Sequence, residues 1–264
     1  MKIFNILRKT ALIAFISIIS VFGTSTSLSC EVLCDALALA DLTIPVIADA
    51  FDQNGNPIID PNTGQKIQAI NELFFNQRTQ EFFNSENPPN QGLLVGDVIQ
   101  MATSVYNEFS ETDCESGALA SPTATDAKLS VSGSPYPELN GTFQLNSMPT
   151  PTINYGSKAF TSTIFQLATP GYYAVNMDAN KGRTIPEHSY DNNFYVGDQG
   201  NYSRGNSYLF YVEDNLDGKN ITKLSSYKRN DLAPKTFEEV KALEIYKFLH
   251  SEAYKEWILE KYKS

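Results

Sequence analysis

The sequence contains few of the residues from which catalytic and metal centres are most often built. Its 264 residues include two histidines and three cysteines, and neither histidine lies near a cysteine in the sequence. It also lacks a glycine-rich phosphate-binding loop and a paired-histidine motif. We therefore expect neither a cysteine–histidine zinc site nor P-loop chemistry, and no cofactor. Carboxylate pairs stay open as catalytic candidates, because 30 acidic residues allow many combinations.

Basic residues are also scarce. The chain has 20 lysines and arginines against 30 aspartates and glutamates, which gives a formal net charge of −10. Nucleic-acid binding needs a basic surface, so nucleic acid is not an expected partner. The same balance disfavours adsorption on anionic lipid and favours solubility on an outer surface.

The apolar run that could direct the chain to a membrane lies at the N-terminus. Met1–Lys9 is basic, Ala11–Phe22 is apolar, and Gly23–Ser29 is rich in small residues. This order is typical of a secretory signal peptide, whereas a membrane-spanning helix needs about 20 apolar residues. We therefore predict export, with a signal peptide over residues 1–29 and a tether over residues 30–40.

Cys30 directly follows the predicted signal peptide, as the acylated cysteine of a bacterial lipoprotein does. Ser27–Cys30 resembles a lipobox loosely, because the favoured leucine lies one place late, at Leu28. Acyl chains on Cys30 would anchor the chain and would be its only contact with a membrane. We therefore expect an outer-membrane lipoprotein at the cell surface or in the periplasm. Ordinary cleavage, with Cys30 free or in a disulfide, is the alternative.

Three cysteines in an exported protein leave one unpaired. If Cys30 carries lipid, Cys34 and Cys114 can form a disulfide that an oxidising compartment would preserve. Two other pairings stay open. One joins Cys30 to Cys114, and the other joins Cys30 to Cys34 and leaves Cys114 free.

Residues 96–212 carry the alternation of apolar and polar side chains that marks half-buried β-strands. In Gly96–Asn107, one predicted face holds Ile99, Met101, Thr103 and Val105, and the other holds Gln100, Ala102 and Ser104. Further strands are predicted at residues 41–48, 127–132, 161–167, 172–177, 194–196 and 208–212. The first of these is expected at an edge, because Pro45 lacks the amide donor of a central strand. The pattern predicts a mainly β protein, an antiparallel, immunoglobulin-like sandwich over residues 41–214.

We expect a long excursion from this sandwich over residues 50–92. Dense turn signals occupy Asp52–Pro57 and Asp60–Gly64. Apolar residues then recur with a helical spacing at Ile67, Ile70, Leu73 and Phe74. This spacing favours a short helix or an irregular cover after the turns.

The first of these turns resembles the start of a calcium-binding loop, because oxygen-bearing side chains recur at Asp52, Asn54, Asn56 and Asp60. Its glycine, Gly55, stands in the fourth position rather than the sixth that an EF-hand loop requires. A plain turn is therefore favoured over a calcium site.

The C-terminal segment, residues 215–264, changes from a strand pattern to a helical one. Thr236–Glu239 has the capping-box pattern that starts a helix. Glutamate and lysine then recur three residues apart, as helix-stabilising pairs do. We predict a linker followed by a helix that bends near His250–Ser251. Its many apolar residues indicate packing on the sandwich or on a partner.

Three motifs resemble the CARDB family, a cell-adhesion-related domain of bacteria. Gly96–Asn107 resembles the family's strand that begins with Gly-Asp and ends in Asn, and Pro170–Asp178 resembles its Gly-x-Tyr strand that ends in Asp. Ile185–Asn193 resembles its Glu-x-x-x-x-Asn-Asn corner. The resemblance covers residues 41–212 and implies a seven-stranded, immunoglobulin-like sandwich on a secreted or surface protein, usually non-catalytic. The excursion, the loop containing Cys114 and the C-terminal helix depart from the family pattern.

Asn192 and Asn193 are predicted to fix the turn in this corner. Asparagine tolerates left-handed backbone angles and bonds to nearby turn amides. The rival interpretation is a calcium site with four oxygen ligands, Asp178, Asn180, Glu187 and Asp191. The structural turn is favoured, so we expect no metal here.

No motif favours catalysis, and the protein is not expected to be an enzyme. His188, Ser189 and Asp191 are too close in the sequence to form the geometry of a catalytic triad. We therefore expect a non-catalytic binding module that serves adhesion or assembly with another protein at the cell surface. A carbohydrate-binding accessory lipoprotein is the alternative, because some of the many tyrosines could stack on a surface glycan. A hydrolase is the second alternative.

Overall fold

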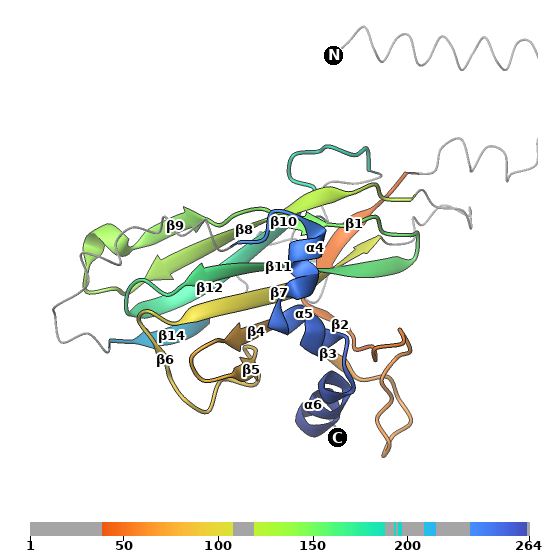
Figure 1. Cartoon of the computed structure of the whole chain (residues 1–264), viewed down its shortest axis with the longest axis horizontal. Helices are drawn as coiled ribbons and strands as arrows, with labels where there is room; N and C mark the ends of the chain where they lie inside the picture. The colour runs from red at the N-terminus through yellow and green to blue at the C-terminus, as the bar shows by residue number, and fades with distance from the viewer. Residues whose placement is uncertain are drawn as a thin grey trace, which may run out of the picture.

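Two β-sheets packed face to face, with three α-helices against one of them and a separate two-stranded sheet, make up the described part of the chain (Figure 1). The structure is a computed structural model, and it describes residues 39–107, 119–187, 193, 195–196, 209–214 and 233–262. The predictions for Cys30, Cys34, Cys114, Asp191 and Asn192 fall outside these residues.

The first sheet is built around the long strand β7. In the described residues it contains β1 (Leu42–Pro45), β4 (Glu72–Asn76), β5 (Glu81–Phe83), β7 (Val98–Asn107), β11 (Ser157–Gln166) and β13 (Tyr195–Val196). β11 pairs with β7 along its whole length. On the other side of β7, β1 and β4 lie end to end, with β1 opposite Tyr106–Asn107 and β4 opposite Ile99–Thr103.

The second sheet is built around β8 and β12. Its described strands are β6 (Leu93–Leu94), β8 (Thr123–Ser132), β9 (Gly141–Gln144), β10 (Met148–Thr150), β12 (Gly171–Ala179) and β14 (Leu209–Glu213), and a 3-10 turn, η1 (Pro137–Leu139), precedes β9. β9 and β10 lie end to end on one side of β8, because β12 occupies the other side. Such divided strands explain why the sheets contain more strands than the seven that the CARDB resemblance implied.

Inward-facing residues of both sheets fill the space between them, which confirms the predicted mainly β, antiparallel sandwich. Every second residue is buried from Thr125 to Val131 in β8 and from Tyr173 to Ala179 in β12. The largest fully buried side chains include Tyr173, Phe74, Phe83, Leu42, Ile44, Ile99, Met101 and Leu129. Burial of this apolar surface is the main force that holds the two sheets together.

Between β1 and β4 the chain leaves the first sheet and forms a separate hairpin of β2 (Ile47–Asp49) and β3 (Gln68–Ile70). Asn71 fills the gap that this departure leaves beside β7. Its side-chain amide donates to the Ser104 carbonyl at 2.9 Å, and its side-chain oxygen accepts from the Ser104 amide at 3.0 Å. One side chain thus satisfies the buried backbone groups that lack a strand partner.

The helix predicted after the turns is wrong, because the segment contains β3 and β4. Phe74 packs in the core between the sheets, whereas Leu73 and Phe75 pack with the C-terminal helices. A strand that is buried on both faces carries successive apolar residues and loses the period of two. The edge position predicted for Pro45 is also wrong in the described residues, since β13 lies beyond β1.

Three helices cover the outer face of the first sheet: α4 (Phe237–Ala242), α5 (Glu244–Leu249) and α6 (Glu252–Tyr262) (Figure 1). The helical segment breaks near His250–Ser251, as predicted, and also at Leu243, whose backbone is extended. The Ile245 amide donates to Gln100 Oε1 at 3.0 Å. The polar face predicted for β7 is therefore buried beneath α5. In the part of the chain that the structure describes, no helix is long and apolar enough to span a membrane.

Candidate binding pocket

One flank of the sandwich is open, where β5 ends the first sheet and β6 ends the second in the described residues. A pocket of about 320 Å³ lies there, which we call the flank pocket. It is lined by Phe74, Phe83, Asn84, Ser85, Pro88, Pro89, Gly92, Leu93, Phe210, Tyr211 and Glu213. Its volume is at the lower end of the range for small-molecule pockets, so it suits a small ligand or an inserted side chain.

Aromatic rings from both sheets form the inner wall of the flank pocket. The ring centroids of Phe74 and Phe83 are 5.2 Å apart, and Phe210 lies edge-on to them at 5.5 and 6.2 Å. Tyr173 stacks on Phe210 at 5.6 Å. Stacked and edge-to-face pairs at these distances are favourable. The wall belongs to the packed core and is formed without a ligand.

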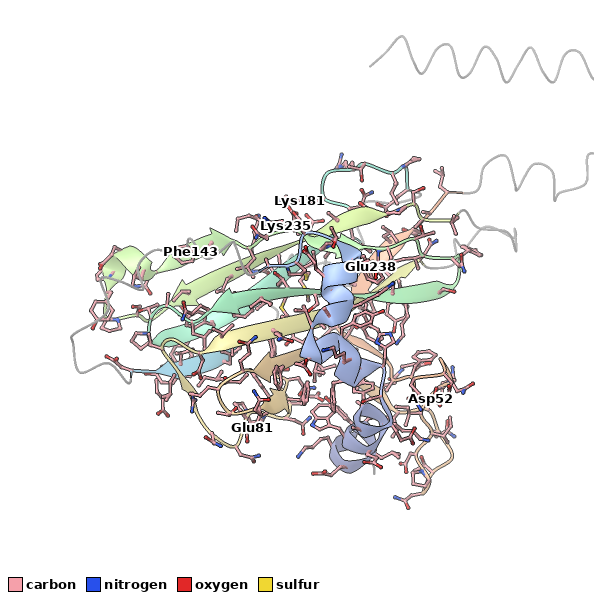
Figure 2. All side chains as sticks on the ribbon, viewed as in Figure 1. Asp52, Glu81, Phe143, Lys181, Lys235 and Glu238 are labelled. Atoms are coloured by element: carbon pink, nitrogen blue, oxygen red, sulfur yellow. The ribbon has the colours of Figure 1, made fainter. Side chains whose placement is uncertain are left out.

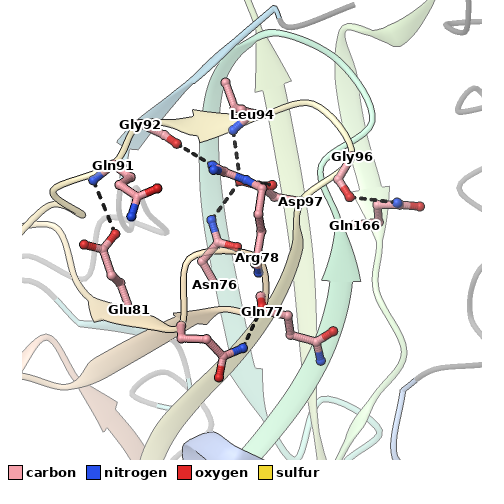
Figure 3. Close-up of polar contacts among 11 residues, drawn as sticks. Asn76, Gln77, Arg78, Glu81, Gln91, Gly92, Leu94, Gly96, Asp97 and Gln166 are labelled. Carbon is pink, nitrogen blue, oxygen red and sulfur yellow. Dashed lines mark hydrogen bonds and ion pairs between the residues drawn. The ribbon is translucent and has the colours of Figure 1, made fainter.

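An ion pair holds residues 92–94 at the edge of the pocket, a segment that we call the lip (Figure 3). Arg78 Nε donates to Asp97 Oδ1 at 2.6 Å, and Arg78 Nη2 donates to the Gly92 carbonyl at 2.7 Å. The Asn76 side chain and the Leu94 amide also donate to Asp97, at 2.7 and 3.0 Å. Burial alone would raise the pKa of Asp97, but these donors outweigh burial and hold the pKa below its ordinary value. Asp97 therefore ties residues 92–94 to the β4–β5 turn.

The loop that follows β5 is held from both ends. Asn84 Oδ1 accepts from the Glu86 amide at 3.1 Å, and Asn84 Nδ2 donates to the Tyr262 hydroxyl at 2.7 Å. Glu81, labelled on this flank in Figure 2, accepts from the Gln91 amide at 3.3 Å. The loop is thus fastened to β5 and to α6, which gives the pocket a defined rim.

Glu213 supplies the carboxylate of the flank pocket. Its Oε1 lies 3.4 Å from the position that a Cβ atom on Gly92 would occupy, so the carboxylate lies over the lip. Glycoside hydrolysis, as one example, needs two carboxyl groups that flank the scissile bond, and the lining residues offer one. The arrangement suits the binding of an apolar group beside a positive charge.

Two exposed tyrosines extend the aromatic surface beyond the pocket. Tyr172 and Tyr211 are 47% and 52% exposed, and their ring centroids lie 5.0 Å apart. The ring planes are tilted by 57°, so they form a notch rather than a flat platform. Exposed rings beside a pocket are typical of interaction surfaces.

A second, much smaller cavity lies beneath α5 and α6. Its volume of about 30 Å³ has room for roughly two water molecules. Lys158 lines it, with Nζ 4.0 Å from the ring centroid of Phe51 and 3.2 Å from the Tyr106 hydroxyl. Burial lowers the pKa of Lys158 to about 7, although Asp49 opposes the shift. The cavity is too small to hold a substrate.

Glu72 is another buried ionisable residue, and it is 3% exposed. Neither of its carboxylate oxygens has a hydrogen-bond partner among the described residues. Burial raises the pKa of Glu72 well above its ordinary value. A carboxyl group in such surroundings favours the protonated form.

The predicted corner brings Asn180, Glu187 and Asn193 together. Glu187 Oε1 accepts from the side-chain amides of Asn180 and Asn193, the latter at 2.9 Å, and Oε2 accepts from the Leu42 amide at 2.8 Å. Asn193 also donates to the Ala179 carbonyl at 2.7 Å. Glu187 thus links the corner to the first sheet through N–H donors, whereas a calcium ion would need its oxygens free.

Two other candidate metal ligands, Asp178 and Asp52, are not among the groups that bond to Glu187 in this corner. Asp178 is on β12, in register with Asp126 of β8. Asp52, beside α6 in Figure 2, accepts from the amides of Asn54 and Asn56, each at 2.9 Å, which is the geometry of a plain Asx turn. Within the described residues, no group of three histidine, cysteine, aspartate or glutamate side chains could hold a metal ion.

The flank pocket could not be identified from the sequence, because its residues come from four separate segments. The strand pattern around Phe210 was recognisable, whereas no strand was predicted around Phe83, which follows the segment expected as a short helix or an irregular cover. No local signal shows that these strands end at the same flank.

No protein-family model and no curated protein matches the chain. Among solved structures, the chain is similar to the CARDB domain of the PF1109 protein from Pyrococcus furiosus, which was crystallised in complex with di-metal ions. The sequence identity is 11%, the match covers 67% of this chain and 89% of that chain, and the TM-score is 0.30. The solution structure of the same domain gives 10% identity, coverage of 67% and 97%, and a TM-score of 0.29. At scores this low the likeness carries no argument about function, and CARDB membership stays a prediction.

Proposed function

We propose that the chain is an exported, lipid-anchored and non-catalytic module that binds another protein in adhesion or assembly. The flank pocket carries this proposal. It is open, its wall is made of core aromatic residues, and its lip is fastened by an ion pair. Rigid apolar pockets of this kind hold the anchor side chains on which protein interfaces depend.

The residues of the CARDB-like motifs support a scaffold role. Asp97, from the Gly-Asp motif, pairs with Arg78, and Glu187, from the corner, accepts from the Leu42 amide. A general acid or base must reach a substrate proton, whereas these two carboxylates are buried and already engaged by donors. Their roles are those of structural fasteners in a binding module.

The N-terminal pattern supports export and anchoring. A signal peptide over residues 1–29 would leave Cys30 for acylation and Cys34 with Cys114 for a disulfide. The intact mass of the membrane-extracted protein should show cleavage before Cys30, added acyl chains and the loss of two thiol hydrogens. A mass without acyl chains contradicts the anchor and leaves the binding role to be judged separately.

Site-specific photo-crosslinking in the native cells tests the binding role. A photoreactive residue in place of Ser85, on the pocket rim, should give a defined crosslinked protein band. The same residue in place of Gln65, on an exposed turn of the excursion, is the matched control and should not give that band. A band shared by both positions, or no band from Ser85, contradicts the proposal.

The exposed tyrosine pair favours a second candidate, a carbohydrate-binding accessory lipoprotein. Aromatic faces such as those of Tyr172 and Tyr211 can pack against the apolar face of a sugar ring. Titration with a panel of methyl glycosides should then perturb the ring signals of Tyr172 and Tyr211, and Tyr172→Ala should abolish the shifts at Tyr211. Glycosides that leave these signals unchanged remove this candidate.

A further inference from the structure

We propose that the flank pocket takes an apolar side chain that is flanked, in the partner's own sequence, by a lysine or an arginine. This inference rests on the proposed function and deepens it. The proposed function assigns a protein partner to the pocket, and the inference assigns the chemistry of the segment that binds there. Four features of the pocket carry the inference, namely its apolar wall, its few polar groups, its occupied strand edge and its acidic rim.

The wall of the flank pocket favours an apolar occupant. Phe74, Phe83 and Leu93 are each nearly fully buried in the core, yet they contribute the floor of a space of about 320 Å³. Water in such a space has few hydrogen-bonding partners. Replacing that water with an aliphatic or aromatic side chain removes apolar surface from solvent on both molecules.

The polar groups of the pocket are too few for a sugar ring. Asn84 Oδ1 is already used by the Glu86 amide, and its Nδ2 donates to Tyr262. The side chains of the lining then offer the hydroxyls of Ser85 and Tyr211 and the carboxylate of Glu213. A sugar carries several hydroxyl groups, and each one that is buried without a partner costs binding energy. An apolar side chain with one neighbouring charge matches these few polar groups better than a sugar does.

The strand edge beside the pocket is occupied, so the partner binds by a side chain rather than as an added strand. Strand addition needs free backbone donors and acceptors. Just before β6, the Gly92 carbonyl accepts from Arg78, and within β6 the Leu94 amide donates to Asp97. Both groups would have to be released before another strand could pair there.

The rim of the pocket is acidic. Glu213 lies over the lip at Gly92, Asp214 follows it, and Glu86 stands exposed in the loop between two lining residues. Within the described residues, Arg78 contacts the lip through the Gly92 carbonyl, and it is already paired with Asp97. A lysine or arginine next to the inserted side chain would therefore meet complementary charge, which favours association and its orientation.

Peptide titration followed by backbone amide NMR tests the inference on the purified exported chain, residues 30–264. The probes are three capped pentapeptides, Gly-Lys-Leu-Lys-Gly, Gly-Lys-Ser-Lys-Gly and Gly-Glu-Leu-Glu-Gly. The first should give saturable shifts at Leu93, Phe210 and Glu213. The serine peptide should bind at least tenfold more weakly because it lacks the apolar anchor, and the glutamate peptide should do so because its charges are repelled.

Substitutions on the protein separate the contribution of the apolar anchor to binding from the contribution of the neighbouring charges. Glu213→Gln should lower the affinity for the lysine–leucine peptide several-fold and remove the preference of the pocket for this peptide over the glutamate peptide. The apolar anchor should still bind. Glu244→Gln, on the exposed start of α5, is the matched control and should leave the affinity unchanged. Equal binding of all three peptides, or shifts that lie outside the flank pocket, would overturn the inference.

This inference and the proposed function can fail separately. A crosslinked partner at Ser85 with no preference among the peptides would keep the protein-binding role and reject the chemistry assigned to the segment. The expected peptide preference without a crosslinked partner in cells would keep the pocket's chemistry and reject the proposed role.

Discussion

Single polar side chains complete the backbone hydrogen bonding of this sandwich where strand pairing does not. Asn71 bonds both backbone groups of Ser104, Asp97 accepts from the lip of the flank pocket, and Glu187 accepts from Leu42. The sequence motifs drew attention to Asp97 and Glu187. They could not show the partners, because the partner of Glu187 lies 145 residues away in the chain. Buried polar side chains of this kind must be paired, and the fold supplies the pairs.

Glu72 is a buried carboxyl group for which the described residues offer no hydrogen-bond partner, and its burial predicts an unusual pH dependence of stability. Its raised pKa means that the folded chain keeps the proton to higher pH than the unfolded chain, where a glutamate titrates near pH ~4.3. Stability is therefore fullest below that pH and falls as the pH rises toward the raised folded value. Glu72→Gln should be more stable than the natural chain at pH 8 by at least about 1 kcal/mol, with the difference narrowing toward pH 4.

Urea unfolding across this pH range measures the effect. Glu86→Gln, on the exposed loop, serves as the control for the loss of one carboxylate. A Glu72→Gln variant whose stability stays below that of the natural chain at pH 8 would show that the carboxylate is ionised and paired in the folded state.

The lowered pKa of Asp97 predicts the opposite dependence of folding stability on pH. Its pKa is held low, so its ion pair stabilises the fold above the unfolded value of about 3.9 and ceases to do so as the pH falls through the folded value. Asp97→Asn should cost about 2–3 kcal/mol at pH 7, because it removes the buried carboxylate that pairs with Arg78. The cost should shrink below pH 4 in thermal or urea unfolding. Glu238→Gln, from an exposed pair with Lys241, should cost only a few tenths of a kcal/mol, and equal costs for the two variants would contradict the account.

At the scale of elements, the strands with one buried face were predictable, whereas β4 was missed and the burial of the second face of β7 was not foreseen. β8 and β12 alternate cleanly, and the sequence located both. β4 is buried on both faces, so its apolar residues resembled a helix. The outer face of β7 looked like a solvent face because its cover, α5, lies more than a hundred residues later in the chain. Nothing in β7 itself indicates that cover.

The cap of α4 tests whether the start of the helical segment is held locally. Thr236 Oγ1 accepts from the Glu239 amide at 3.2 Å, which is the N-cap bond that the sequence predicted. Thr236→Ala should destabilise the segment by about 1 kcal/mol. Hydrogen exchange should then be faster in the amides of Phe237–Ala242 and unchanged in β8. Unaltered protection of α4 would show that tertiary packing alone holds it.

A substitution at Ile245 tests whether the packing of α5 on the first sheet stabilises the fold. The Ile245 side chain is buried between α5 and the outer face of the first sheet, and the Ile245 amide donates to Gln100. Ile245→Ala should reduce the free energy of unfolding by about 2–4 kcal/mol, since it leaves a cavity against β7. Ile47→Ala, at an exposed position, should change it by less than about 0.5 kcal/mol. A small effect at both positions would mean that the helices are only loosely attached.

At the scale of the whole molecule, the helices cover one face of the sandwich (Figure 1), and the flank pocket lies where β5 and β6 end the two sheets in the described residues. The sandwich class followed from periodicity, because each strand carries its own signal. The flank pocket did not, because it depends on where separate strands end in space and on an ion pair between Arg78 and Asp97. Local patterns specify elements, whereas a pocket is a property of their assembly.

The central claim is that this flank pocket is where the protein binds its partner. The most direct test fills the pocket and measures binding of the purified exported chain to the envelope fraction of its own cells. Ser85→Trp should reduce that binding at least tenfold, while Gln65→Trp, on an exposed turn outside the pocket, should leave it unchanged. Equal binding by the two variants would contradict the account.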